Sequence, residues 1–137
     1  MTRINLIPVR ELSDQHLMAE YRELPRMAHF AGKTKQRKED IPVSFTLNKG
    51  HMTFFLDKAE FLEQRHAEIV EECLRRGIKI KNTDRFKMPR TFEQSDWVPT
   101  EEEINVSRER IHEKLAMKPF FYKWSKNDAT LKQLSES

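Results

Sequence analysis

The sequence contains a single cysteine, Cys73, among its 137 residues. A lone cysteine excludes an internal disulfide and any metal site built from several cysteines. Cys73 lies in the apolar pattern of an expected helix, beside Leu74 and four residues after Ile69. Because buried thiols are common and unreactive, we expect a structural thiol at this position and no catalytic one.

Long hydrophobic runs are also missing. The sequence has no stretch of roughly 18 apolar residues, and its first residues lack the charged and then apolar pattern of a signal segment. We therefore expect neither membrane insertion nor secretion, and we place the protein inside the cell, in the cytoplasm. The length suits one core but not two, so we expect a single domain over 1–137 with a polar tail at about 127–137.

The charge balance does not identify a partner by itself. The formal net charge is only +3, so binding to a polyanion requires basic residues gathered on one face. A basic cluster does occur in the polar segment 31–49, where both a solvated loop and a DNA contact are possible readings of Lys33, Lys35, Arg37 and Lys38.

The first two helices are indicated by helical spacing of apolar residues and by capping signals. One helix should begin after Ser13, which can cap it, and extend to Phe30 with a kink at Pro25. A second should span 57–76 and end at Gly77, with Asp57 and Glu60 forming a capping box. Its apolar stripe comprises Phe61, Leu62, Ile69, Val70, Cys73 and Leu74.

A third helix should open at Thr100, whose hydroxyl can cap while Glu103 reaches back, and Pro119 should stop it. Its inward positions are Ile104, Ile111 and Leu115. Segments 31–49 and 78–99 have little periodicity and are expected to be loops. The sequence thus predicts a compact all-α domain of three main helices.

Turning the first helix by about 100° per residue separates two faces. The expected core face comprises Leu17, Met18, Tyr21, Leu24 and Ala28. The opposite face carries His16, Glu20, Arg22, Glu23 and Arg26. An ordinary solvated face explains this set as well as a functional one does. No second histidine stands at ligand spacing beside the first, so we assign no metal.

The N-terminus offers a possible nucleophile. Because Thr2 is small, the initiator methionine would normally be removed, which leaves a free α-amine. Such an amine has a pKa of about 7.7 to 8.0, against about 10.4 for lysine, so a much larger fraction is neutral near neutral pH. The neighbouring Arg3 can lower that pKa further and can also hold a phosphate.

Three blocks of the sequence, MTRINL at the start, DQHLMAEYRELPR in the first helix and GHMTFFLDKAEFL at 50–62, resemble the pyrimidine-dimer DNA glycosylase family. They cover about a quarter of the chain, in the family's order. The segments 31–49 and 78–99 and the tail after Lys126 show little similarity. These departures leave the chemistry intact but leave the range of lesions open.

The resemblance implies an all-helical enzyme whose N-terminal segment is threaded between helices, so that the Thr2 amine lies next to Glu23. It further implies a bifunctional DNA glycosylase and abasic-site lyase. The amine would form an imine with the sugar of the lesion, and Glu23 would transfer protons. The partner would be double-stranded DNA containing ultraviolet-induced pyrimidine dimers or abasic sites. This chemistry needs no cofactor, and a monomer is our default.

By position in the matching blocks, the resemblance implies DNA contacts for Arg3, Gln15, His16, Arg22 and Arg26. In the third helix the segment RERIHEK resembles the family's basic segment, which adds Arg110 and Lys114 as phosphate candidates. The later segment FFYKWSK is similar in character to the family's C-terminal tail. Its rings could contact the lesion region or simply pack against the protein.

Two rival functions remain open. The chain could be a DNA-damage-binding module that performs no cleavage, which would need Arg3, Arg22 and Arg26 but no free Thr2 amine. It could also be an enzyme that acts mainly as a lyase at abasic sites, where the aldehyde is already exposed. Removal of Met1 separates the first rival from our reading, because retention would displace the nucleophile by one residue.

Overall fold

Helices and connecting segments, without strands, make up residues 2–125, the part of the chain that the computed structural model describes. The predicted all-α class is therefore confirmed. The polar tail expected at 127–137 lies outside the described residues. The α-helices are α1 (Asp14–Glu23), α2 (Arg26–Lys33), α3 (His51–Phe54), α4 (Ala59–Arg75) and α5 (Glu101–Met117), accompanied by 3-10 turns at Val9–Glu11, Lys38–Asp40 and Phe55–Asp57.

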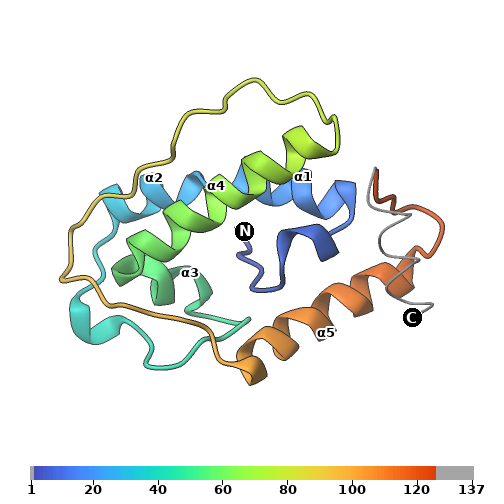
Figure 1. The fold of residues 1–137 in the computed structure, drawn as a ribbon. Coiled ribbons are helices and arrows are strands. Elements are labelled where there is room, and N and C mark those ends of the chain that lie inside the picture. The colour runs from blue at the N-terminus through green and yellow to red at the C-terminus, as the bar shows by residue number, and fades with distance from the viewer. Residues whose placement is uncertain (1, 126–137) are drawn as a thin grey trace.

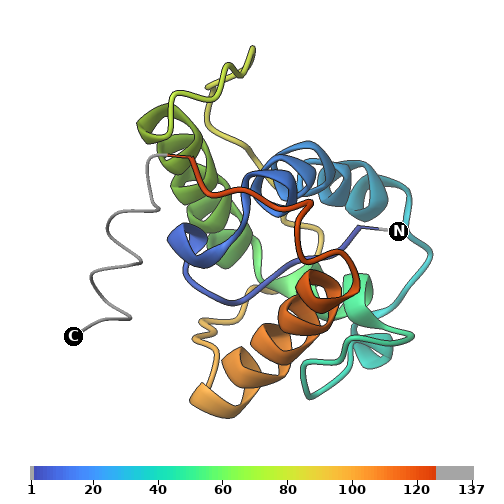
Figure 2. The same cartoon turned by 90° about the vertical axis from the view of Figure 1, so that its right-hand side faces the viewer.

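The N-terminal segment lies between two groups of helices. Helices α1, α2 and α4 lie on one side of it and α5 on the other, as two views of the fold show (Figures 1 and 2). The backbone N–H of Leu6 donates to Ser107 Oγ of α5 at 2.9 Å, and Asn5 Nδ2 donates to Glu20 of α1 at 2.8 Å. Both helix groups therefore fix the position of this segment.

The first predicted helix is in fact two helices. The Ser13 hydroxyl accepts a hydrogen bond from the His16 N–H at 3.1 Å, which confirms the predicted cap. At Pro25, however, the helix breaks instead of kinking, and α2 continues beyond the predicted end at Phe30 to Lys33. The break is expected physically, because proline has no N–H to donate and its ring collides with the preceding turn.

The second predicted helix ends as expected but does not begin as expected. Gly77 ends α4 in the left-handed conformation, with φ of 77°, and the Ile78 N–H donates to Cys73 O at 2.9 Å. Together these features form a Schellman C-cap. The predicted capping box of Asp57 with Glu60 is wrong. The chain tightens into a 3-10 turn before α4, so the carboxylate of Asp57 instead accepts a bond from Lys58 Nζ at 2.7 Å.

The third predicted helix agrees with the structure at its start. Thr100 Oγ1 accepts from the Glu103 N–H at 3.2 Å, and the Thr100 N–H donates to the Glu103 carboxylate at 2.9 Å. The helix ends at Met117, before Pro119. Of its expected inward positions, Ile111 is buried, whereas Ile104 and Leu115 are partly buried.

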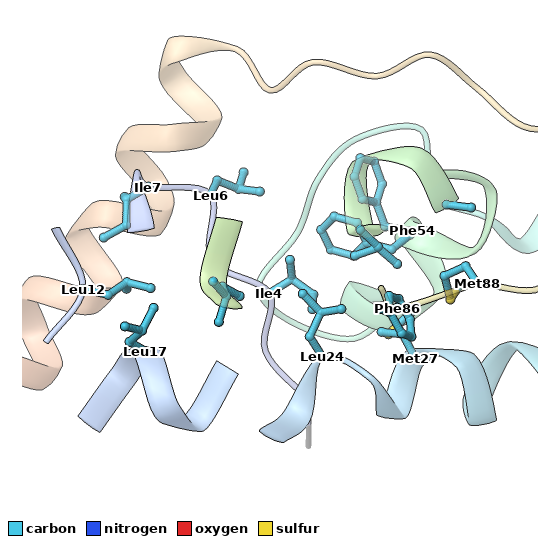
Figure 3. Packing of buried hydrophobic residues seen from close by; sticks show 14 of the residues in the cluster. Ile4, Leu6, Ile7, Leu12, Leu17, Leu24, Met27, Phe54, Phe86 and Met88 are labelled. Carbon is cyan, nitrogen blue, oxygen red and sulfur yellow. The ribbon is translucent and has the colours of Figure 1, made fainter. Parts of the chain in front are cut away.

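The core joins apolar side chains from the N-terminal segment, α1, α2, α4 and the turn around Phe54 and Phe55, both of which are buried (Figure 3). Cys73 is buried too, and burial raises the pKa of its thiol to about 11, as a structural thiol requires. The prediction that Leu74 belongs to the buried apolar stripe is wrong, since 55% of this residue is exposed. Cys73 fills the inward position of the last turn, and Leu74 points about 100° away from it.

A buried ion pair joins α1 to α4. The sequence reading placed Glu20 on the exposed face of the first helix, but only 1% of Glu20 is exposed. Its carboxylate accepts from Arg65 Nε at 2.7 Å and from Asn5 at 2.8 Å. Arg65 also donates to the backbone oxygen of Ile7. Glu20 follows the buried Leu17 by three residues, so it stands at the edge of the apolar stripe, where α4 covers it.

Replacing Arg65 with methionine should lower the free energy of unfolding by about 3 to 5 kcal/mol, because the Glu20 carboxylate then remains buried without its cation. Urea unfolding measures the loss. Arg37→Met is the matched control, since Arg37 pairs with Glu39 in an exposed ion pair, and such pairs contribute little. Equal losses in the two variants would contradict a structural role for the buried pair.

Candidate functional site

The N-terminal residues are buried against the end of α1. Thr2 is only 2% exposed, and its hydroxyl donates to the backbone oxygen of Glu23 at 3.4 Å. Two residues further on, the Ile4 N–H donates to Nε2 of His51, the first residue of α3, at 2.9 Å. The start of the chain is thus held within hydrogen-bonding distance of the residue that the sequence reading paired with it.

A pocket opens beside this contact, where the N-terminal segment, α1 and α5 meet. It is lined by Arg3, Asn5, His16, Ala19, Glu20, Glu23, Arg110 and Lys114. Five residues that the sequence reading proposed for the site, from three separate parts of the chain, therefore lie around one pocket: Arg3, His16, Glu23, Arg110 and Lys114.

Positive charge is concentrated in this pocket. Burial lowers the pKa of Arg110, as does the positive charge of Arg3, while the negative charge of Glu23 acts in the opposite direction. Burial also lowers the pKa of His16, and the charges of Arg110 and Lys114 lower it further. Crowded cations of this kind raise the local concentration of anions, so the pocket is suited to a phosphate-bearing ligand.

The two carboxylates of the pocket have different surroundings. Glu20 is neutralised by Arg65 and hydrogen-bonded to Asn5. Glu23 is partly exposed, and within residues 2–125 its carboxylate accepts no hydrogen bond, although Arg110 acts on it through space. Glu23 is therefore the carboxylate of this pocket that is available to a ligand.

The predicted contact residues outside the pocket lining lie in two places. Arg22 and Arg26 are exposed, at the end of α1 and the start of α2. Gln15 is partly buried, and both ends of its amide are used: Nε2 donates to Phe121 O at 2.9 Å, and Oε1 accepts from the Lys123 N–H at 3.1 Å. In this structure Gln15 therefore holds the segment after α5.

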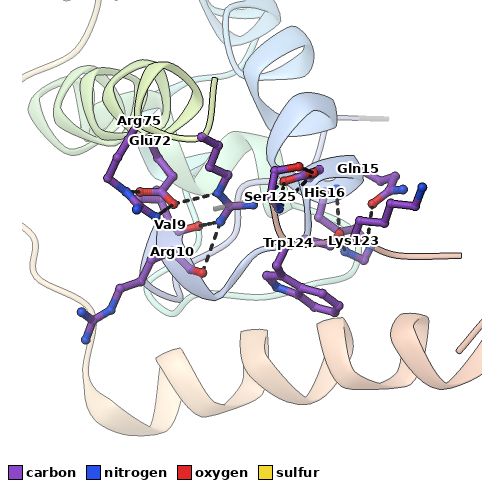
Figure 4. Close-up of polar contacts among 12 residues, drawn as sticks. Val9, Arg10, Gln15, His16, Glu72, Arg75, Lys123, Trp124 and Ser125 are labelled. Carbon is purple, nitrogen blue, oxygen red and sulfur yellow. Dashed lines mark hydrogen bonds and ion pairs between the residues drawn. The ribbon is translucent and has the colours of Figure 1, made fainter. Parts of the chain in front are cut away.

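That segment packs along α1 (Figure 4). The ring of Tyr122 stacks on His16 with 4.6 Å between centroids, and Trp124 Nε1 donates to Glu11 O at 3.1 Å. Phe120, in contrast, is 97% exposed. Both readings of the aromatic segment thus have a basis, since Tyr122 and Trp124 pack against the protein while Phe120 faces solvent. Lys126 lies outside the described residues.

A buried arginine that the sequence analysis missed supports the same segment through Asp14, which accepts hydrogen bonds from both Arg76 and Ser125. Arg76 donates to Asp14 at 2.9 Å and to Glu72 at 2.7 Å. Burial raises the pKa of Asp14, but hydrogen bonds from Ser125 and Arg76 outweigh it and leave that pKa below its ordinary value. The spacing of Glu72 and Arg76, four residues apart on one helix, was the available signal.

Two residues of the basic cluster proposed between residues 33 and 38 pair with acidic side chains. Arg37 lies 3.6 Å from the carboxylate of Glu39, and Lys38 lies 3.5 Å from that of Glu93. Lys35 is exposed. The segment around these residues also contains the 3-10 turn Lys38–Asp40, so it is not entirely a loop.

The electrostatics of the pocket make a prediction for His16. Its pKa should lie below 6.5, and Arg110→Met should raise it, because a positive charge that opposes protonation is removed. Burial should keep the value below 6.5 even in the variant. Titration of the imidazole resonances by NMR measures both. Lys79→Met, which removes an exposed charge outside the pocket, should leave the His16 pKa unchanged, and equal shifts in the two variants would contradict this arrangement.

No helix in residues 2–125 combines the length and the hydropathy needed to cross a membrane. Within the same residues, no three His, Cys, Asp or Glu side chains are placed to hold a metal ion together.

Comparison with known protein families gives one match. The family model described as pyrimidine dimer DNA glycosylase matches residues 1–86 of the 137-residue chain. The matched range contains the N-terminal segment, α1, α2 and α4, and it includes 31–49, where the sequence reading found little similarity. It does not contain α5. Because the match covers more than half of the chain, the chain belongs to the pyrimidine dimer DNA glycosylase family.

Proposed function

We propose that the protein excises ultraviolet-induced cyclobutane pyrimidine dimers from double-stranded DNA, with the Thr2 amine as nucleophile and Glu23 as its acid/base partner. Family membership supports a DNA-repair glycosylase that acts on pyrimidine dimers. The observation that carries the finer proposal is the contact of Thr2 with Glu23 at the edge of a cationic pocket.

The amine suits attack on a sugar carbon. Removal of Met1 would expose the Thr2 nitrogen, and roughly a quarter of such an amine is neutral near neutral pH, given an α-amino pKa of about 7.7 to 8.0. Arg3 lies next in sequence and lines the pocket, so its charge disfavours protonation of the amine. A neutral amine is the form that can attack.

The reaction begins when the Thr2 nitrogen bonds to C1′ of the 5′ sugar of the dimer and the glycosidic bond breaks. The base leaves with the bonding electrons, takes a proton from the Glu23 carboxyl group and stays joined to its neighbour through the cyclobutane ring. The sugar then opens as its ring oxygen takes up a proton lost by the amine, which gives an iminium.

The second half of the reaction breaks the strand. A base removes a proton from C2′, the C3′–O bond breaks, and the 3′ phosphate leaves with its electrons. Glu23 is the carboxylate of the pocket that is not already paired, so it is suited both to accept this proton and to stabilise the positive iminium. No step needs a cofactor.

Three cations that line the pocket are suited to the phosphates on either side of the lesion: Arg3, Arg110 and Lys114. We assign further phosphate contacts to Arg22 and Arg26, which are exposed at the end of α1 and the start of α2. A dimer site is poorly stacked and cheap to bend, so phosphate contacts along a bent duplex can select it through its deformability. Recognition then depends on this cationic surface more than on contacts to base edges.

Borohydride trapping on a duplex that contains one thymine dimer tests the mechanism. We expect a covalent adduct that peptide mapping locates on the Thr2 amine, and none on an undamaged duplex of the same sequence. Glu23→Gln should bind the damaged duplex as tightly but excise it on the order of 10²- to 10⁴-fold more slowly, because proton transfer is lost.

Each other outcome would support a different function or mechanism for this protein. Tight binding to the damaged duplex without an adduct would support the non-catalytic binding module. Trapping on an abasic duplex but not on the dimer duplex would support the lyase. An adduct on a lysine instead of Thr2 would disprove the proposed nucleophile, and full excision by Glu23→Gln would remove Glu23 from the mechanism.

Substitution of the cations tests the DNA-binding surface. Arg26→Ala and Arg110→Ala should each weaken binding and reduce the slope of log affinity against log salt by about 0.9 for each phosphate contact that is lost. Fluorescence anisotropy at several salt concentrations measures both effects. Lys79→Ala, an exposed charge outside the pocket, is the control, and an unchanged slope in the arginine variants would contradict the phosphate assignment.

A further inference from the structure

His51 is a buried histidine whose protonation state is set by its two hydrogen-bond partners. It is 1% exposed, Nε2 accepts the backbone N–H of Ile4 at 2.9 Å, and Nδ1 lies 2.8 Å from the backbone oxygen of Thr46. An amide N–H can only donate and a carbonyl oxygen can only accept. The ring must therefore be neutral, with its proton on Nδ1.

The surroundings of His51 oppose a positive charge. The rings of Phe45 and Phe55 meet it edge to face, with centroids 5.6 and 5.4 Å away. The charged groups that act on it are Arg3 from the N-terminal segment and Arg110 from α5, both cations. Burial, followed by these two charges, lowers the pKa of His51, although its bond to Thr46 partly opposes the shift.

The loop that presents His51 also holds the preceding residue of the N-terminal segment. The guanidinium of Arg3 donates to the backbone oxygen of Leu47, so consecutive residues of that segment are bound by the same loop. The loop turns into α3 through Gly50, whose φ of 95° suits glycine, and a Cβ there would lie 3.1 Å from Pro42. The loop thus binds the N-terminal segment at Ile4, only two residues after Thr2, the proposed nucleophile.

We propose that His51 is a positioning residue for excision: its neutral ring acts through Ile4 to hold Thr2 against Glu23, and its protonation releases the N-terminal segment. The inference rests on Thr2 being the nucleophile. A proton on Nε2 would put two donors face to face at Ile4 and would add a third positive charge beside Arg3 and Arg110. A displacement of about 1 Å at the reacting atom can lower the rate about 10²-fold.

Two variants separate positioning from packing. His51→Gln keeps an acceptor for the Ile4 N–H but cannot ionise, whereas His51→Phe fills the aromatic site and accepts no hydrogen bond. Single-turnover excision of a dimer duplex with enzyme in excess gives the rate constant, and anisotropy gives the affinity. We expect His51→Phe to lower the rate constant about 10- to 100-fold with unchanged affinity, and His51→Gln to recover most of the loss.

The pH profile is the readout that simple packing would not change. Below 6.5 the wild-type rate should fall more steeply than one proton explains, because the Thr2 amine and His51 both become protonated as the pH falls. His51→Gln should restore a one-proton slope. His66→Gln is the matched control, since His66 is also buried with a pKa lowered by burial but, within residues 2–125, forms no hydrogen bond with the N-terminal segment.

The outcomes keep this inference apart from the proposed function. If wild-type protein is trapped at Thr2 but His51→Gln keeps the wild-type slope, the role of His51 is disproved and the proposed function stands. If wild-type protein is not trapped, the proposed function fails and this inference fails with it. Thermal unfolding of both variants is measured in parallel, and if His51→Phe does not fold, the slope of His51→Gln decides alone.

Discussion

The buried pair of Glu20 and Arg65 is the interaction on which the rest of the structure depends. It connects α1 to α4, and its remaining hydrogen bonds reach Asn5 and the backbone of Ile7. Two buried charges are stable only when they neutralise each other and satisfy their remaining donors and acceptors, so this arrangement tolerates little displacement. The pair therefore fixes the N-terminal segment at Asn5 and Ile7, and this helps to hold Thr2 beside Glu23.

The same pair makes the two carboxylates of the pocket different from each other. Glu20 and Glu23 are three residues apart on α1 and both line the pocket, but only Glu20 has an arginine from α4 opposite it. A carboxylate that carries out chemistry needs room for a ligand, whereas one that holds a scaffold needs a permanent partner. One turn of a helix thus supplies a structural carboxylate, Glu20, and the carboxylate proposed to react, Glu23.

Local chemistry was predictable from the sequence, and long-range pairing was not. Ser13, Thr100 and Gly77 were identified correctly because a cap depends on residues within four positions of it. Glu20 was misjudged because its partner, Arg65, comes from another helix that periodicity cannot locate. Asp57 was misjudged because the chain tightens into a 3-10 turn before α4, where the carboxylate pairs with Lys58. For the site, the matching blocks indicated most of the pocket lining, but not the role of His51 or the use of Gln15 to hold the segment after α5.

Helix α5 stands apart in how it is attached. Only Ser107 and Ile111 are buried along its length, yet Arg110 and Lys114 reach from it into the pocket, and it lies outside the range matched by the family model. The amine and the carboxylate of the proposed chemistry come from one stretch of sequence, and two of the proposed phosphate contacts, Arg110 and Lys114, come from another. Because so few residues of α5 are buried, its outward-facing residues can be substituted with little loss of stability. If α5 holds the DNA as proposed, preference among damaged substrates can therefore change during evolution while Thr2 and Glu23 stay the same.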